Sequence, residues 1–341
     1  MIELIDDALH FTFPKVHPGA GITIRFHRTL RIPDDGKDYP LPPGLGSFPL
    51  RHVDDFLGKV PSNWIERAGV MLPMYQSEAL WISFDANYAM DHEADYPFAI
   101  KVGTGKINAV TGSSWSDGLQ KNPQSYMVAP EQPWLDGYCV EKGFISQFVA
   151  MPLGAGYSAE EQLTGKAEYG GIQIAVYPMK REVFERRFPK VKRVARDIDM
   201  VCECRSSMAE YGMGLAPGGR MRQEIYEDPF DFADWDQGNT SRCFVHLSNS
   251  MLWRSITGEE PPTVPFTSKE YSDAGLPWFD YYNDKTPALK GSDELKKLKS
   301  VKEISKQKGD KALPENESVT PEQIIKLRSK LKKNQVREAE F

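Results

Sequence analysis

The chain has 341 residues, a formal net charge of −6 and four cysteines. It contains no run of the roughly 18 apolar residues that a membrane-spanning helix needs, and residues 1–7 lack the layout of a secretory signal. Four cysteines in a chain of this length do not suggest a disulfide framework, so we expect a protein of the reducing cytoplasm.

Aromatic side chains divide the chain into a body and a tail. Of the 38 aromatic residues, 37 lie between Phe11 and Tyr282, and the remaining one is Phe341. Because aromatic residues supply much of a protein core, we expect a globular body over residues 1–285 and a tail over residues 286–341. The tail has a net charge of +5 and the body −11, which argues against nucleic-acid binding through a broad basic surface.

Alternating apolar and polar side chains predict strands along the body. In residues 22–32 the apolar side chains fall on one face, interrupted by Arg28, and polar or basic side chains fall on the other. We expect the strands on either side of Gly103 and Gly105 to form a hairpin. Shorter segments with the strand pattern are residues 80–84, 98–102, 107–110, 144–151, 171–177, 200–204 and 244–247.

Helix patterns in the body are few and short, and they cover residues 53–59, 63–68 and 179–187. The last of these should end before Pro189, because a residue that precedes proline avoids helical angles. Residues 39–46 are expected to form an extended, ordered loop. Together with 25 prolines and 27 glycines, these patterns predict a β-rich α+β fold of mostly antiparallel, sandwich-like sheets with a helical C-terminal tail. A subdivision of the body near residue 180 is an alternative to a single domain.

A cluster of thiols and one imidazole is the first candidate for chemistry. Cys202, Cys204, Cys243 and His246 supply the ligand types of a tetrahedral zinc site, which would support a metal-dependent enzyme that acts on an anionic substrate. On a strand, however, Cys243 and His246 would face opposite sides, and free cysteines are often simply buried. Core cysteines are therefore the leading interpretation, and zinc is the alternative.

A glycine-rich segment, residues 211–222, is a candidate anion site. Backbone amides of Gly218 and Gly219, with the guanidinium groups of Arg220 and Arg222, would bind a phosphate or carboxylate. The segment matches neither the P-loop nor the dinucleotide-binding pattern. An ordinary turn between strands is therefore the other interpretation.

Two charged segments allow further interpretations. Residues 227–236 contain five carboxylates, which could bind calcium, although their order is not that of an EF-hand and a solvated loop is simpler. Residues 180–196 contain eight basic and two acidic side chains. That pattern is typical of a polyanion binder or of a surface that pairs with the body's own carboxylates, and we favour the second interpretation.

Two aromatic clusters, residues 131–136 and 275–282, fit either a ligand-binding rim or buried anchors, and we favour anchors. No catalytic signature is complete, so the sequence does not decide whether the protein is an enzyme.

The tail has its own pattern, with a short helix predicted over residues 292–304, a mobile linker over 305–319 and an amphipathic helix over 320–337. The terminal helix carries an apolar stripe of Ile324, Leu327 and Leu331 beside Lys330 and other lysines. An isolated helix of this length is marginal and gains stability by docking. We therefore expect a non-enzymatic binding or scaffolding protein whose terminal helix engages a protein partner or a second copy.

Four short segments, residues 51–55, 148–154, 213–219 and 275–280, resemble parts of an uncharacterised bacterial protein family. The resemblance implies a bacterial protein and no particular activity.

Overall fold

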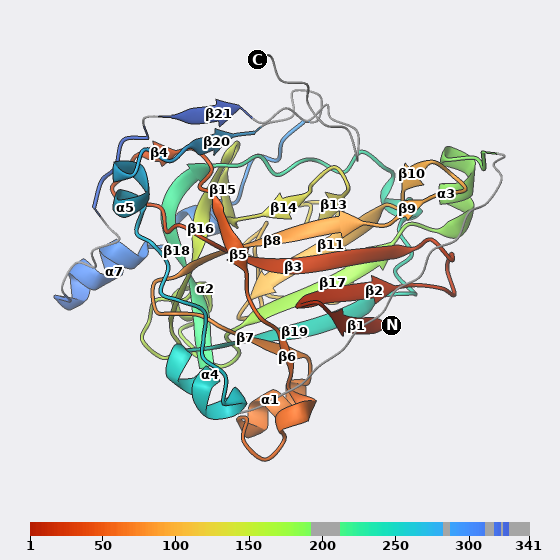
Figure 1. Ribbon diagram of the computed structural model, residues 1–341. Coiled ribbons are helices and arrows are strands. Elements are labelled where there is room, and N and C mark those ends of the chain that lie inside the picture. Colours follow the sequence, from red (N-terminus) through yellow and green to blue (C-terminus); the bar gives the residue numbers. More distant parts are fainter. Residues whose placement is uncertain (192–211, 282–286, 311–316, 322, 327–341) are drawn as a thin grey trace, which may run out of the picture.

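A computed structural model describes residues 1–191, 212–281, 287–310, 317–321 and 323–326 (Figure 1). The α-helices are α1 Ser62–Arg67, α2 Ala159–Thr164, α3 Arg181–Arg187, α4 Ser250–Thr257, α5 Ser268–Asp273, α6 Asp293–Lys296 and α7 Val301–Lys308, and short 3-10 turns cover Asp54–Phe56 and Phe232–Asp234. The strands are β1 Ile2–Ile5, β2 Ala8–Thr12, β3 Gly21–Thr29, β4 Asp38–Tyr39, β5 Gly44–Ser47, β6 Arg51–His52, β7 Val70–Pro73, β8 Ala79–Ala86, β9 Tyr88–Ala89, β10 Ala94–Asp95, β11 Phe98–Thr104, β12 Ile107–Asn108, β13 Met127–Ala129, β14 Trp134–Leu135, β15 Gly137–Glu141, β16 Phe144–Pro152, β17 Ile172–Pro178, β18 Gly212–Arg222, β19 Ser241–Ser248, β20 Trp278–Asp280 and β21 Ile324–Lys326.

Most of these strands belong to one large, mostly antiparallel sheet. Hydrogen-bonded neighbours follow the order β2–β3–β8–β16–β18–β19–β17–β11–β13, while β7 and β4 join β19 and β18 in parallel. The sheet bends round so that apolar side chains of β3 and β8 share one core with those of β11 and β17 (Figure 1). This arrangement confirms the predicted β-rich α+β fold with few, short helices.

In strand β3, the predicted alternation of apolar and polar side chains places the apolar ones in the core. Ile24 and Phe26 are fully buried, and Arg28 lies on the same face, where it is paired with the buried carboxylate of Glu78. The polar face differs from the prediction at its end, because Thr29 is buried and its hydroxyl donates to the carbonyl of Pro43. Strand β5, which begins within the predicted loop 39–46, pairs with β3 and covers that end of the strand.

Other predicted features of the body are also confirmed. Strands β11 and β12 pair antiparallel around Gly105. Helix α3 ends at Arg187, directly before Phe188 and Pro189. Strands on either side of residue 180 pair with each other, as β16 does with β18, and buried side chains of both strands belong to one core cluster. The predicted strand 200–204 lies outside the described residues.

The segment that follows residue 286 packs on the body, which differs from the prediction of a separate tail. Leu295 on α6 and Val301 on α7 are buried, because their apolar side chains cover β15 and β18. The backbone amide of Ser292 donates to the carbonyl of Cys139 at 2.9 Å. The predicted linker 305–319 begins inside α7, which extends to Lys308.

The predicted terminal helix also differs over the residues that the structure describes. Residues 324–326 form β21, which pairs in parallel with β20. Two successive β-branched residues, Ile324 and Ile325, favour this extended conformation. The other residues of the predicted stripe, Leu327, Lys330 and Leu331, lie outside the described part of the chain. None of the described helices has the length and hydrophobicity required of a membrane span.

Candidate functional site

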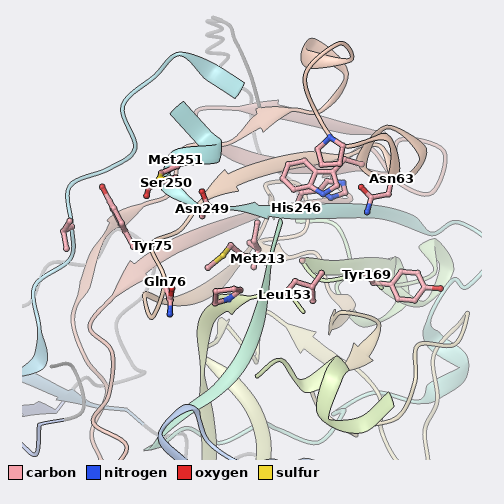
Figure 2. A pocket seen from close by; sticks show the side chains of 16 residues that line it. Asn63, Tyr75, Gln76, Leu153, Tyr169, Met213, His246, Asn249, Ser250 and Met251 are labelled. Atoms are coloured by element: carbon pink, nitrogen blue, oxygen red, sulfur yellow. The ribbon is translucent and has the colours of Figure 1, made fainter. Parts of the chain in front are cut away.

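A cleft of about 840 Å³ lies where the N-terminal ends of α1 and α4 meet β19 (Figure 2). Sixteen residues line it, and none of them is an Asp, Glu, Lys or Arg. Three side-chain amides contribute to the lining, from Asn63 on α1, Gln76 after β7 and Asn249 before α4. The volume falls in the range typical of small-molecule pockets, which are usually apolar with a few placed polar groups.

The pairing of distant strands creates this cleft. β7 and β19 run in parallel, with Leu72 opposite Leu247, so their ends bring residues near 75 and 249 together. The side chain of Asn249 accepts a hydrogen bond from the amide of Leu252 at 2.8 Å and thereby begins α4 at the edge of the cleft. Backbone pairing therefore sets the position of both walls.

His246, on β19, is the only titratable imidazole of the lining. Its ring lies between those of Trp64 and Phe244, with centroids 4.5 and 4.4 Å away and interplanar angles of 24° and 25°. Its Nε2 lies 3.0 Å from the carbonyl oxygen of Ala68. Burial, with a smaller effect of Arg67, lowers the pKa of His246 to about 3, so the ring is neutral at pH 7 and the cleft carries no formal charge.

A buried ion pair holds one wall of the cleft. Nε of Arg28 donates to Oε1 of Glu78 at 2.7 Å, and Oε2 of Glu78 accepts from the backbone amide of Tyr75 at 2.9 Å. Arg28 also donates to the carbonyl of Thr263, the neighbour of Val264 in the lining. Burial raises the pKa of the Glu78 carboxyl, and the facing guanidinium offsets part of that effect. The pair thus joins two lining segments from behind the surface.

A second buried carboxylate holds the opposite wall. Glu160 on α2 accepts three backbone hydrogen bonds of 2.8–2.9 Å, from the amides of Glu168, Tyr169 and Gly170. The chain then turns closely over β19 at Gly171, where φ is +57° and a Cβ atom would lie 2.5 Å from the carbonyl oxygen of Val245. Only glycine fits at this position without a shift of the backbone.

Arg67 is not a lining residue, but it contacts the lining residue Tyr169. Its guanidinium donates to the carbonyls of Glu168 and Tyr169 and lies 4.9 Å from the centroid of the Tyr169 ring. The ammonium of Lys106 lies 4.2 Å from the same centroid. These contacts occupy the aromatic surface of Tyr169 with cations that belong to the protein itself.

The zinc set predicted from the sequence is only partly described. Cys243 belongs to the main core, whereas His246 packs against Trp64 in the cleft wall, so the two side chains lie on opposite faces of β19 as their spacing predicts. Burial raises the pKa of the Cys243 thiol to about 12. Among the described residues, no group of three or more His, Cys, Asp or Glu side chains is placed to hold a metal ion. Cys202 and Cys204 lie outside those residues, so the complete set stays a prediction.

The glycine-rich segment forms part of the long strand β18. Gly218 and Gly219 allow the strand to pass close to its neighbours, since Cβ atoms there would lie 2.4 Å from Val149 and 2.5 Å from the carbonyl of Pro33. Arg220 donates to Asp38 and Glu141 at 2.6 and 2.8 Å, so its charge is already paired. Arg222 is exposed at the end of the strand. The four residues therefore do not form a shared loop around an anion.

The charged segments pair with each other where the structure describes them. Arg187 of the basic segment donates to Asp234 of the acidic loop at 2.9 Å, which confirms an intramolecular use for part of that charge. Asp228 in the same loop accepts from the hydroxyl of Tyr126 and the indole of Trp235. Its carboxylate thus anchors the loop to the core. Residues 192–196 of the basic segment lie outside the described part.

The aromatic clusters are mainly anchors. Trp278 is fully buried, and Trp134 packs on Tyr281 with centroids 4.7 Å apart. Of the lining residues of the cleft, by contrast, the sequence named only His246 as a candidate site residue, and it did so for a different role. The paired glycines at 170 and 171 were a usable signal of a tight turn, but they do not indicate what the turn encloses.

No known family model matches the chain, and neither a curated protein nor a solved structure shows significant similarity to it. The geometry of the cleft is therefore the basis for a functional assignment.

Proposed function

We propose that this protein binds an uncharged organic molecule in the cleft between α1 and α4. One observation carries the proposal: a hollow of about 840 Å³ is lined without a single charged side chain, although 26% of the residues in the chain are charged. A charged ligand would lose its hydration there without gaining an opposite charge. A neutral ligand would bury apolar surface against Leu153 and Met213 and form hydrogen bonds to the side-chain amides.

A rigid lining supports this proposal. The carboxylates of Glu78 and Glu160 lie behind the walls and accept backbone hydrogen bonds from the lining segments. Groups that are held in place before binding lose less conformational entropy when a ligand arrives. The two carboxylates therefore contribute to binding by positioning the walls, without touching the ligand.

The test introduces a charge at the cleft and compares it with the same charge elsewhere on the same helix. Ser250, the first residue of α4, lines the cleft, and Ser255 is exposed on that helix outside the lining. Compounds that raise the melting temperature of the wild-type protein in a thermal-shift screen should be mainly uncharged. They should fail to stabilise the Ser250→Glu variant and should stabilise the Ser255→Glu control as they do the wild type. Equal stabilisation of both variants would place binding outside the cleft.

A second candidate function, self-association through the C-terminal segment, rests on a different observation. Ile324 and Ile325 are 52% and 44% exposed on β21, which belongs to a two-stranded sheet in the described part of the chain. Exposed strands with apolar side chains are common sites for pairing with another chain. Sedimentation velocity of a double variant, Ile324→Ser with Ile325→Ser, tests this candidate. It should lower the fraction of dimer at a fixed concentration, and a wild-type protein that is monomeric at high concentration would exclude the candidate.

A further inference from the structure

The polar groups of the cleft match an amide better than they match other neutral groups. The side-chain amides of Asn63 and Gln76 make no hydrogen bond to any described residue, and that of Asn249 uses only its oxygen, toward Leu252. Each side-chain amide presents a donor beside an acceptor. A secondary amide in a ligand also has one donor and one acceptor. Its N–H can donate to the side-chain carbonyl oxygen, and its carbonyl oxygen can accept from the side-chain NH2 group.

His246 adds an acceptor of fixed direction. A carbonyl oxygen can only accept, so the contact with Ala68 requires the proton on Nε2 and leaves the lone pair on Nδ1. The rings of Trp64 and Phe244 on either side prevent the imidazole from turning. Nδ1 makes no hydrogen bond within the described part of the chain. His246 lines the cleft and is only 1% exposed, so a neutral N–H or O–H donor of a ligand must enter the cleft to reach this nitrogen.

Two of the three aromatic rings of the lining, Trp64 and Tyr169, already have partners, which argues against a sugar as that ligand, and the third, Tyr75, is half-buried. Sugar recognition commonly uses an open aromatic face on which the pyranose ring stacks. Here Trp64 already stacks on His246 and is 4% exposed, and Tyr169 already contacts Arg67 and Lys106. The most exposed apolar groups of the lining are not aromatic, because Met251 and Val264 at the rim are 80% and 70% exposed. Flexible thioether and aliphatic surface suits the side chains of a peptide.

We propose that the cleft binds a short, uncharged peptide segment that donates a backbone N–H to Nδ1 of His246. Its other amide groups pair with Asn63, Gln76 or Asn249, and its apolar side chains lie against Met251 and Val264. The inference rests on the proposed function of the cleft and names its ligand class. His246 then determines specificity, since it requires a neutral donor at one position of the ligand.

The test uses a library of tetrapeptides built from neutral residues, with acetylated N-termini and amidated C-termini. The tightest binder found by titration calorimetry is then methylated at each backbone nitrogen in turn. Methylation of one nitrogen should weaken binding to the wild-type protein about tenfold, the value of one hydrogen bond. His246→Phe keeps the stacked ring and should weaken binding of the parent peptide by a similar factor. The methylated peptide should bind that variant no more weakly than the parent peptide does.

A measurement on the wild-type protein keeps the inference testable if His246→Phe does not fold. Binding of the parent peptide should shift the Nδ1 resonance of His246 in nitrogen-15 spectra, and the methylated peptide should leave it in place. An unshifted resonance on binding, or independent effects of methylation and His246→Phe, would overturn the role of His246.

The same experiments distinguish failure of the peptide assignment from failure of the proposed function. If no blocked peptide binds while other uncharged compounds protect the wild type and not the Ser250→Glu variant, the peptide assignment fails and the proposed function stands. If nothing binds in the cleft, both fail.

Discussion

Two hollows in the described part of the chain differ in where they keep their charges. The groove beside α6, about 590 Å³ in volume, is lined by Lys121, Lys290, Glu227, Asp228, Asp293 and Glu294. The cleft between α1 and α4 has no charged lining residue, and the carboxylates of Glu78 and Glu160 lie buried behind its walls. Exposed charges are screened by water and position little, whereas buried charges with several hydrogen-bond partners hold backbone segments in place. In the groove, Asp228 has such partners in Tyr126 and Trp235, but its neighbours in the lining include exposed charges. Only the uncharged cleft therefore combines a fixed shape with a surface that is cheap to desolvate.

Removal of the Glu78 carboxylate should have the largest effect on stability and tests whether a buried charge holds the cleft wall. The Glu78→Ala change leaves the guanidinium of Arg28 buried without its partner and should destabilise the protein by about 3–5 kcal/mol. Urea unfolding at pH 7 measures this effect. A double change, Arg28→Met with Glu78→Leu, should cost much less, because it removes both charges and keeps the volume. A single change that costs under about 1 kcal/mol would show that the pair does not hold the wall.

Removal of the second buried carboxylate should have the next largest effect. Glu160→Ala leaves three backbone amides without an acceptor and should lower the free energy of unfolding by about 3 kcal/mol. Glu160→Gln retains one acceptor oxygen and should cost about half as much. Hydrogen exchange of the amides of Tyr169 and Gly170 gives a local measurement. Unchanged protection of these amides in Glu160→Ala would contradict the assignment.

The pH dependence of stability tests the neutral state of His246. Its pKa is lowered from 6.5 to about 3, so the unfolded chain binds the proton first as the pH falls. The stability that neutral His246 contributes is therefore complete above pH 6.5 and is lost between pH 6.5 and 3, with about 2 kcal/mol lost at pH 5. The difference in unfolding free energy between wild type and His246→Phe isolates this effect from carboxylates that titrate in the same range. A difference that does not change with pH would mean that His246 is as easily protonated in the folded state.

The smallest effect is expected at the edge of the charged groove. Lys297, which directly follows α6, pairs at 2.6 Å with Glu294 of the groove lining, and both side chains are more than half exposed. Lys297→Ala should change the free energy of unfolding by no more than about 0.5 kcal/mol. An effect as large as that of Glu160→Ala would remove the contrast between the two hollows.

Local pattern and long-range pairing explain how much of this structure could be predicted. The alternation in residues 22–32 predicted β3 and placed Arg28 on its buried face, because both follow from a period of two. The partner of Arg28 lies 50 residues away, and no spacing rule identifies it. A separate tail was predicted from the near absence of aromatic residues after residue 282. In the structure, α6 and α7 nevertheless pack on the body, with Leu295 and Val301 buried.

The candidate site was harder to predict than the fold. Gln76 and Asn249 line one cleft because β7 and β19 pair in parallel, and nothing local in either segment indicates that pairing. His246 was recognised as a chemically capable residue, but the sequence associated it with thiols and the fold placed it between two aromatic rings. The residue type indicated that His246 is capable of chemistry, but its role depends on contacts such as that with Trp64, which is distant along the chain.

The contact between α6 and β15 has a practical consequence. Burial raises the pKa of the Cys139 thiol to about 12, and the carbonyl of the same residue accepts a hydrogen bond from Ser292. An alkylating reagent needs both access and a thiolate, so it would modify this sulfur, which belongs to the main core, only during openings that expose β15. The rate of alkylation of Cys139, followed by mass spectrometry, therefore reports how often the core opens at β15, where α6 is attached through Ser292.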